Sequence, residues 1–267
     1  MAHQPIITLT TDFGSSDHFV GVMKGVILSI NPQASIVDIS HQIQPYDLLD
    51  GALTIAQAYP YFPPASIHVV VVDPGVGSER RPILVSSDKH YFVAPDNGVL
   101  SVVLDREPGA TVRHITSEHY FLSPVSNTFH GRDVFAPVAA YLSKGVDTSR
   151  FGEIVTECVR VPLPRAQRVG EKEIKGVILK VDNFGNCLTN ITPEDVPELF
   201  ASSPPPFRLV TGQKEINKLF LSYAAGPVDE PFAILGSSGY LELATNRAHA
   251  AQLLGARRGT ELSIFLE

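Results

Sequence analysis

The chain has 267 residues, of which 44% are hydrophobic and 18% are charged. A chain of this length can bury a sizeable core without disulfides or metal ions, and it corresponds to one or two domains. The low share of charged residues excludes extended disorder. The net charge of −7 argues against a general electrostatic hold on nucleic acid or on anionic lipid. We therefore expect a globular protein that binds a small molecule, and neither nucleic acid nor a membrane.

The two cysteines and the N-terminus bear on the cellular compartment. Cys158 and Cys187 lack the paired spacing of a zinc site, and no other metal site is predicted. The N-terminal residues lack the basic-then-apolar pattern of a signal peptide. The longest apolar run, residues 67–72, is much shorter than the roughly 18 residues of a membrane span. These features predict a cytoplasmic protein.

Residues 1–163 predict an α/β layered domain with a mostly parallel sheet. The run at 67–72 is almost continuously apolar, which is typical of a strand buried on both faces of a parallel sheet. Apolar residues between positions 19 and 30 recur at helical spacing. The expected strands cover 6–10, 35–39, 67–72, 83–85 and 90–94, and the expected helices cover 19–30, 47–59, 98–104 and 132–142.

The second part of the chain predicts a smaller, all-β, barrel-like domain over residues 176–267. A polar stretch with few apolar residues, 164–175, is expected to be the linker between the two domains. Short runs with β character follow it, separated by turn residues at spacings that suit a barrel or a sandwich. These runs cover 176–181, 187–191, 207–210, 232–235, 240–243 and 261–266.

Acidic residues follow two of the predicted strands of the first domain. Asp12 and Asp17 come after the first strand, and Asp73 comes after the third. The carboxyl ends of strands line the ligand crevice of a doubly wound sheet, so these carboxylates are expected at one edge. As alternatives, Asp12 or Asp17 caps the next helix, and Asp73 only forms a turn. The nearby Arg80 favours an ion-paired Asp73 in a cleft.

Two further segments combine polar residues with turn signals. His130 precedes the expected helix at 132–142, where an imidazole can face a ligand, although a lone histidine is more often structural or exposed. Arg132 and Asp133 are interpreted as an ion pair at the helix start. The segment from Asp182 to Asn186 offers a carboxylate, an aromatic ring and a carboxamide, or it is simply a hairpin turn.

Five of these segments, taken in chain order, resemble the motifs of one enzyme family. They are Thr-Asp-Phe-Gly-Ser-Ser-Asp at 11–17, Val-Asp-Pro-Gly-Val-Gly at 72–77 with Arg80, Thr-Phe-His-Gly-Arg-Asp at 128–133, Asp-Asn-Phe-Gly-Asn at 182–186 and Gly-Ser-Ser-Gly-Tyr-Leu-Glu at 236–242. The sequence resembles the S-adenosyl-L-methionine hydroxide adenosyltransferases, also called S-adenosylmethionine hydrolases. The resemblance implies an α/β domain, a β-barrel-like domain and a homotrimer. It places the substrate between one subunit's N-terminal domain and its neighbour's C-terminal domain.

The resemblance also implies roles for individual residues. Asp73, Arg80 and His130 match the family's water-handling triad. The other matches are substrate contacts: Asp12 with the ribose hydroxyls, Asp17 and Asp182 near the methionine amino group, Tyr46 in a stacking position, Phe184 and Asn186 with adenine, Ser237 with the methionine carboxylate, and Glu242 from the same segment. Ser238 stands where the related halogenases carry arginine.

The implied reaction is hydrolysis of S-adenosyl-L-methionine to adenosine and L-methionine. Water attacks the ribose 5′-carbon, and methionine departs as a neutral thioether, so no general acid and no cofactor is expected. The base is either His130 or Asp73, and the sequence favours His130 because a partner such as Arg80 weakens a carboxylate as a base.

Two alternatives to hydrolysis stay open. One is a halogenase-like substitution by chloride, which is disfavoured because Asp73 stands where the halogenases carry tyrosine and a carboxylate repels a halide. The other is a protein that binds adenosine or S-adenosylmethionine without turnover. The complete set of Asp73, Arg80 and His130 argues against this second alternative.

Overall fold

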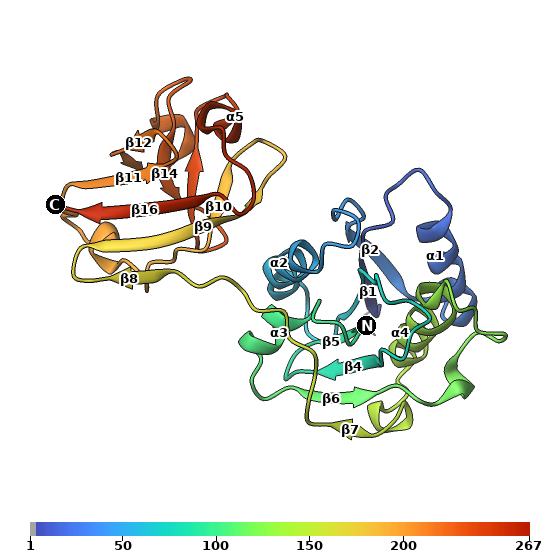
Figure 1. Cartoon of the computed structure of the whole chain (residues 1–267). Coiled ribbons are helices and arrows are strands. Elements are labelled where there is room, and N and C mark those ends of the chain that lie inside the picture. Colours follow the sequence, from blue (N-terminus) through green and yellow to red (C-terminus); the bar gives the residue numbers. More distant parts are fainter. Residues whose placement is uncertain (1–3) are drawn as a thin grey trace. The chain divides into compact units, whose positions relative to one another are not determined.

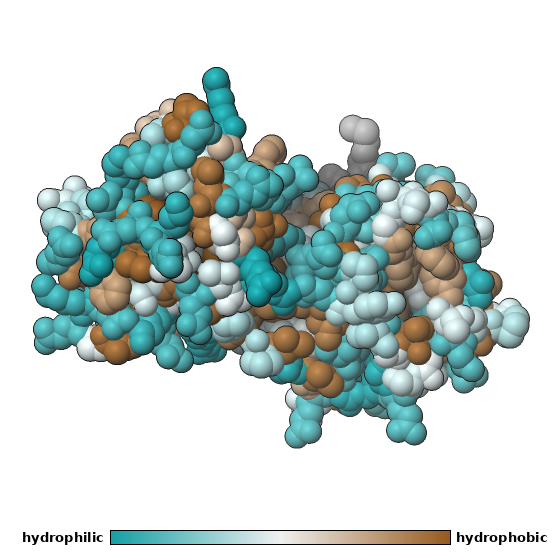
Figure 2. Space-filling view, turned by 45° about the horizontal axis from the view of Figure 1, so that its top comes forward, coloured by the Kyte–Doolittle hydropathy of each residue, from teal (hydrophilic) through white to brown (hydrophobic). Residues whose placement is uncertain are grey.

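The structure is a computed structural model that describes residues 4–267. The chain divides into two compact units, Met1–Leu163 and Pro164–Glu267. Each unit has its own sheet (Figure 1) and its own hydrophobic core. Among the described residues no helix is long and apolar enough to cross a membrane. The face seen in Figure 2 is largely hydrophilic, with hydrophobic residues scattered in small groups.

The first unit contains a seven-stranded sheet of order β2-β1-β3-β5-β4-β6-β7. Its strands are β1 (Ile6–Thr11), β2 (Ser35–Ser40), β3 (Ile67–Val71), β4 (Pro82–Ser86), β5 (Tyr91–Pro95), β6 (Thr111–His114) and β7 (Ile154–Val155). β2, β1, β3 and β5 pair in parallel, whereas β4, β6 and β7 pair antiparallel. The sheet is therefore mixed, and the expectation of a mostly parallel sheet was wrong.

The β4–β5 connection explains the change of direction. Only residues 87–90 join the two strands, and the Ser87 N–H donates to the His90 carbonyl at 2.9 Å. A parallel pair needs a crossover of about a dozen residues or more, so this connection allows only an antiparallel hairpin. The apolar pattern of a buried strand shows that both faces are covered but says nothing about the direction of its neighbour.

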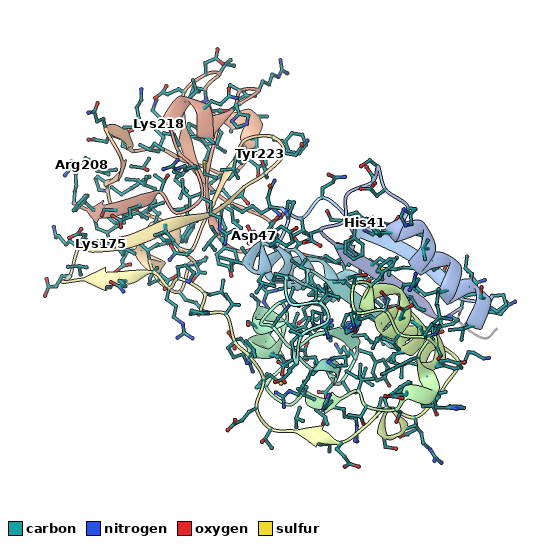
Figure 3. All side chains as sticks on the ribbon, turned by 45° about the vertical axis from the view of Figure 1, so that its right-hand side comes forward. His41, Asp47, Lys175, Arg208, Lys218 and Tyr223 are labelled. Carbon is teal, nitrogen blue, oxygen red and sulfur yellow. The ribbon has the colours of Figure 1, made fainter. Side chains whose placement is uncertain are left out.

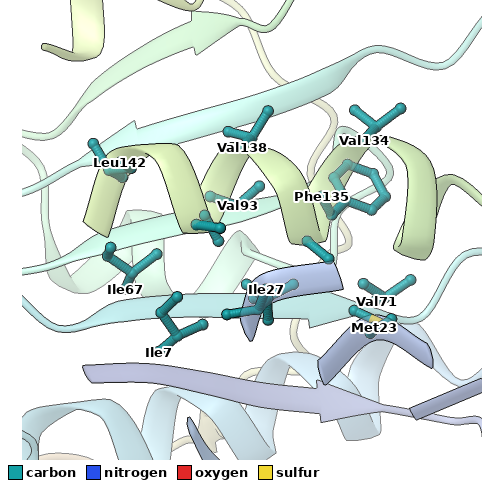
Figure 4. Packing of buried hydrophobic residues seen from close by; sticks show 14 of the residues in the cluster. Ile7, Met23, Ile27, Ile67, Val71, Val93, Val134, Phe135, Val138 and Leu142 are labelled. Carbon is teal, nitrogen blue, oxygen red and sulfur yellow. The ribbon is translucent and has the colours of Figure 1, made fainter. Parts of the chain in front are cut away.

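Helices cover both faces of this sheet. They are α1 (Phe19–Ile30), α2 (Leu48–Ala58), α3 (Ser101–Arg106) and α4 (Ala136–Ser143). Alternate residues of a strand point to opposite faces. Accordingly, Val69 and Val71 of β3 join a cluster with α1 and α4, shown in Figure 4. Val70 joins the second cluster, with α2 and α3. The predicted α/β layering is confirmed. The helices cover the faces of the sheet, and the loops that follow β1 and β3 lie at its carboxyl edge.

The second unit is mostly β and curls into a half-barrel. Eight of its nine strands follow the order β12-β11-β16-β9-β10-β15-β14-β13, and β8 pairs with β9. They are β8 (Gln167–Val169), β9 (Glu173–Val181), β10 (Cys187–Thr189), β11 (Phe207–Thr211), β12 (Lys214–Ile216), β13 (Leu219–Phe220), β14 (Phe232–Leu235), β15 (Leu241–Ala244) and β16 (Glu261–Leu266), with one short helix, α5 (Ala250–Leu254). The segment 164–175, expected as a linker, contains β8 and the first residues of β9.

Candidate active site

The carboxyl ends of two neighbouring strands bring two aspartates together. β1 and β3 pair in parallel with Thr11 opposite Val71, so the residues that follow both strands lie at one edge of the sheet. Burial raises the pKa of the Asp12 carboxyl, and the nearby charge of Asp73 raises it further. The two carboxylates therefore lie within electrostatic reach of each other.

Arg80 holds the Asp73 carboxylate with three hydrogen bonds. Its Nε donates to both carboxylate oxygens at 3.0 Å, and its Nη2 donates to Oδ2 at 2.5 Å. The two side chains are 8% and 5% exposed, so this is a buried ion pair of fixed geometry. The guanidinium also lies over the Phe135 ring, with 5.3 Å between its carbon and the ring centroid. Arg80 Nη1 is buried and meets no hydrogen-bond partner within the described residues.

His130 joins this pair through the same guanidinium. Arg80 Nη2 lies 2.7 Å from His130 Nδ1. A guanidinium nitrogen can only donate, so Nδ1 accepts and the neutral ring carries its proton on Nε2. Burial lowers the pKa of His130, and the positive charge of Arg80 lowers it further. The imidazole is therefore neutral at ordinary pH, and its second nitrogen is a donor.

Close packing between two loops sets the position of His130 relative to Arg80. Gly77 has φ +78°, and a Cβ atom at this position would overlap the Asn127 carbonyl oxygen. Only glycine allows this approach and this backbone conformation. Asp133 also fixes the segment before His130, since it pairs with Arg132 at 2.6 Å and accepts from the Ser126 N–H at 2.8 Å. The expected ion pair of Arg132 with Asp133 is thus present.

Asp12 is held by the backbone of Tyr46. The Tyr46 N–H donates to Asp12 Oδ2 at 2.9 Å. Tyr46 has φ 67°, a left-handed conformation that is costly for a bulky residue and that persists only where the surroundings impose it. Tyr46 as a whole is 72% exposed. The next residue, Asp47, caps α2 by accepting from the Asp50 N–H at 3.0 Å and lies on the ribbon of Figure 3 at the start of that helix.

Neither Asp12 nor Asp17 caps α1, so this alternative was wrong for both. The N-cap position belongs to His18, whose side chain makes no capping hydrogen bond. Asp17 is exposed, and within residues 4–267 it has no hydrogen bond or ion pair. The structure brings Asp12, Asp73, Arg80 and His130 together but does not tie Asp17 to them.

In the second unit, Asp182 organises the turn between β9 and β10. Its Oδ1 accepts from the backbone N–H groups of Phe184 at 2.9 Å and Asn186 at 2.8 Å, and its Oδ2 accepts from the Asn186 carboxamide at 2.9 Å. This segment therefore forms a hairpin turn, which is one of the two alternatives that the sequence left open. The same turn buries Asn186 and leaves Phe184 76% exposed.

The last motif forms the turn from β14 to β15. Ser237 is exposed, and Glu242 accepts a hydrogen bond from the Tyr223 hydroxyl at 2.9 Å. Burial raises the pKa of Glu242, and Asp182 raises it further. The sequence analysis missed Tyr223, because it lies in the short 3-10 helix η6 (Tyr223–Ala225), which has neither a periodic pattern nor a motif.

The site residues predicted from the sequence thus belong to two groups, each described within its own unit. Asp12, Asp17, Tyr46, Asp73, Arg80 and His130 belong to the first, and Asp182, Phe184, Asn186, Ser237 and Glu242 belong to the second. Among residues 4–267, no group of three or more His, Cys, Asp or Glu side chains could hold a metal ion.

An α/β unit with an Asp–Arg–His cluster at its strand ends, followed by a mostly-β unit, defines one class of protein. Sequence models of the SAM hydroxide adenosyltransferase N-terminal and C-terminal domains match residues 7–152 and 176–263. The chain belongs to this family.

Named relatives and solved structures agree with this assignment. The chain is 36% identical to the (R)-S-adenosyl-L-methionine hydrolase of Methanocaldococcus jannaschii, covering 97% of this chain and 95% of that protein. It is 35% identical to the enzyme of the same name from Salinispora tropica, covering 99% of both. A fluorinase from Actinoplanes is 26% identical, covering 97% of both. A crystal structure of an uncharacterized conserved protein from Thermotoga maritima has a TM-score of 0.88 at 36% identity, covering 97% of this chain and 99% of that one.

Proposed function

We propose that this protein hydrolyses S-adenosyl-L-methionine to adenosine and L-methionine. The observation that carries this proposal is the buried cluster of Asp73, Arg80 and His130 at the carboxyl edge of the sheet. The relatives named (R)-S-adenosyl-L-methionine hydrolase are 32–36% identical, whereas the fluorinases are more distant at 25–26%.

The reaction is a substitution at the ribose 5′-carbon. The water oxygen forms a bond to this carbon while the carbon–sulfur bond breaks, and the electron pair of that bond goes to sulfur. Methionine leaves as a neutral thioether, and a base takes one proton from the water. No electrons are exchanged with a redox partner, and the leaving group needs no proton, so the chemistry uses only S-adenosylmethionine, water and the base.

We propose Asp73 as that base, in place of the His130 that the sequence favoured. His130 Nδ1 accepts from Arg80, and the other ring nitrogen carries the proton, so the neutral ring has no free lone pair for the water. The Asp73 carboxylate has lone pairs beyond those that Arg80 occupies. A weak base suffices, because the water becomes strongly acidic as its oxygen bonds to carbon.

The remaining donors of the cluster suit the water oxygen. Arg80 Nη1 is buried with no partner within the described residues, and His130 Nε2 carries a proton. We propose that these donors orient the water in line with the carbon–sulfur bond. A reacting pair held about 3–3.5 Å apart accounts for much of the rate of such a reaction.

Several finer points belong to this proposal and rest on family membership. We propose that Asp12 binds the ribose hydroxyls, that Tyr46 stacks on the substrate, that Phe184 and Asn186 contact adenine, and that Asp17, Asp182, Ser237 and Glu242 surround the methionine end. We also propose a homotrimer in which one subunit's first unit and its neighbour's second unit enclose the substrate. A cytoplasmic location stays a prediction from the sequence.

The test is product analysis in water labelled with heavy oxygen. The protein is incubated with each sulfonium epimer of S-adenosylmethionine. The products are separated by chromatography, and their masses are measured by mass spectrometry. We expect methionine, together with adenosine that carries the label in its 5′-hydroxyl, from the (R) epimer. Unlabelled adenosine, or binding without products, would contradict the proposed hydrolysis. A parallel incubation with chloride tests the halogenase alternative, which requires 5′-chloro-5′-deoxyadenosine.

A further inference from the structure

A series of polar contacts lies beside the loop that carries Asp12, and the reaction proposed above does not use it. The series is centred on His41, which follows β2 directly and is labelled in Figure 3. His41 Nδ1 lies 2.9 Å from Thr11 Oγ1, and Thr11 is fully buried at the end of β1. The same hydroxyl oxygen accepts from the Phe13 N–H at 3.2 Å. The imidazole is therefore joined, directly or through Thr11, to both residues that flank Asp12.

A bulge in β2 lies between His41 and a second partner, Asp38. β1 and β2 pair in parallel, with Leu9 opposite Asp38. The next residue of β1, Thr10, lies opposite Ser40, so β2 carries one extra residue at this point. A bulge bends its strand and re-aims the side chains beside it. Here His41 Nε2 lies 3.0 Å from Asp38 Oδ1, although the two residues are only three positions apart on the chain.

The Asp38 carboxylate determines which nitrogen of His41 carries the proton. Partial burial raises the pKa of Asp38, but Lys24 and His41 outweigh this effect and lower the pKa overall, so the carboxylate is charged at neutral pH. Lys24 of α1 donates to Asp38 Oδ2 at 2.6 Å. The contact of His41 Nε2 with Oδ1 is electrostatic, because the N–H is not aimed straight at the oxygen. A charged carboxylate only accepts, so in the neutral ring Nε2 carries the proton and Nδ1 accepts from the Thr11 hydroxyl.

His41 also begins the loop that carries Tyr46, so it ties two loops together. The Gly14 N–H donates to the His41 carbonyl at 2.8 Å, and the Tyr46 N–H donates to Asp12 Oδ2 at 2.9 Å. The His41 side chain is 11% exposed, so water competes little for its hydrogen bond with the buried Thr11. The segments 11–14 and 41–46 are thus joined by three links. One of these links is a side-chain hydrogen bond that a conservative substitution can remove.

We propose that His41 is a positioning residue, oriented by Asp38, that holds the loop bearing Asp12 against the loop bearing Tyr46 and so sets the ribose end of the substrate site. This inference rests on the proposed function, and it adds the groups that hold Asp12 in place. A carboxylate binds two ribose hydroxyls well only if its own position is fixed by the surrounding contacts. Loss of the His41 contact should therefore weaken ligands that have the ribose 2′- and 3′-hydroxyls and spare nucleosides that lack them.

The variants His41→Phe and Thr11→Val test this assignment by calorimetry, since both keep the size of the side chain and remove the polar link. Each should weaken adenosine binding about tenfold, the effect of losing one hydrogen bond to a charged group. The affinity for 2′,3′-dideoxyadenosine should stay within about twofold of the wild-type value. Thr11→Ser keeps the hydroxyl and should retain the wild-type affinity for adenosine. In turnover, KM should rise about tenfold and kcat should change less than about twofold, because the ribose contact is equal in the ground and transition states.

A double-mutant cycle tests whether His41 acts through Asp12. If it does, the double variant Asp12→Ala/His41→Phe should bind adenosine no more weakly than Asp12→Ala alone. The controls are His119→Phe, at an exposed histidine of the same unit, and Asp105→Ala, at an exposed carboxylate that pairs with Arg160. Both controls should keep the wild-type affinity for adenosine and the wild-type KM.

Three results would overturn the positioning role. They are an unchanged adenosine affinity in either variant, additive losses in the cycle, and equal losses for adenosine and 2′,3′-dideoxyadenosine, which would indicate general damage to the fold. Thr11→Val exchanges only a hydroxyl for a methyl group, so it decides the question if His41→Phe does not fold. A wild-type protein that binds adenosine without turnover would overturn the hydrolysis, and the same calorimetry would still test His41. A wild-type protein that binds no adenosine would overturn both proposals.

Discussion

At the residue scale, the Asp73 carboxylate is the group on which the proposed chemistry depends. Asp73→Asn keeps the shape of the side chain and one acceptor oxygen for Arg80, but it replaces the other carboxylate oxygen by an amide nitrogen and removes the negative charge that accepts the proton. We expect turnover to fall at least about 10²-fold, the low end of what a general base contributes. Adenosine affinity should change little. The matched control is Asp88→Asn, at an exposed position. Near-normal turnover in Asp73→Asn would show that another group accepts the proton.

Gly77 gives a second prediction at this scale. In Gly77→Ala, the added Cβ overlaps the Asn127 carbonyl oxygen, so the loop that carries Asp73 must move away from the segment before His130. The backbone at φ +78° adds strain for alanine. We expect kcat to fall more than tenfold, because misplacement by about 1 Å can cost that much or more. Gly109→Ala, where no atom lies within 4 Å, should be active.

The sequence could predict the members of this cluster better than their roles. Asp73, Arg80 and His130 lie in short motifs beside predicted strand or helix ends, and the structure joins them through one guanidinium. The direction of the His130 hydrogen bond depends on which nitrogen faces Arg80, and no spacing encodes that. Tyr223 escaped prediction because its partner, Glu242, is distant in sequence and its own segment lacks a pattern.

At the scale of elements, periodicity predicted the longest helices and strands and missed several short ones, such as β6 and α5. α1 and β3 have clear periods because α1 packs on one face of the sheet and β3 is buried on both. β7 and β13 are each only two residues long, which is too short to show a periodic pattern of apolar residues. The antiparallel direction of β4 follows from the length of a loop, a signal that strand patterns do not contain.

β3 also carries a buried histidine that makes stability depend on pH. His68 is 0% exposed, its Nδ1 lies 2.8 Å from Thr8 Oγ1, and its ring stacks on Phe92 at 5.1 Å. Burial lowers its pKa to about 3, and His90 contributes in the same direction. The unfolded chain takes up a proton as pH falls through about 6.5, while the native chain does not. His68 therefore stabilises the fold above this pH, and the effect is lost progressively below it, toward pH 3.

We expect the free energy of unfolding to fall between pH 7 and pH 5, by up to about 1.4 kcal/mol per pH unit below pH 6.5 from His68 alone. Urea denaturation at several pH values measures this slope. His68→Asn keeps a polar atom near Thr8 but cannot take up a proton in this range, so its slope should be smaller. His18→Asn, at an exposed position, is the control. Equal slopes for wild type and His68→Asn would exclude His68 as the source.

At the scale of the whole molecule, the proposed contacts are divided between two units. Asp12, Asp73 and His130 belong to the first, and Asp182 and Asn186 belong to the second. Under the proposed function, a complete site would need one face from each unit. The proposed trimer takes the two faces from different subunits, through a head-to-tail contact that closes into a ring.

Mixing two inactive variants tests this arrangement. Asp73→Asn damages only the first face, and Asn186→Ala damages only the second, so each homotrimer lacks intact sites. In randomly mixed trimers, a site that pairs adjacent subunits combines two undamaged faces in about one case in four, so about a quarter of the wild-type rate should return after subunit exchange. A site built within one chain gives no recovery, because every chain carries one damaged face. Light scattering checks the oligomer, and mass spectrometry of tagged subunits confirms that exchange has occurred.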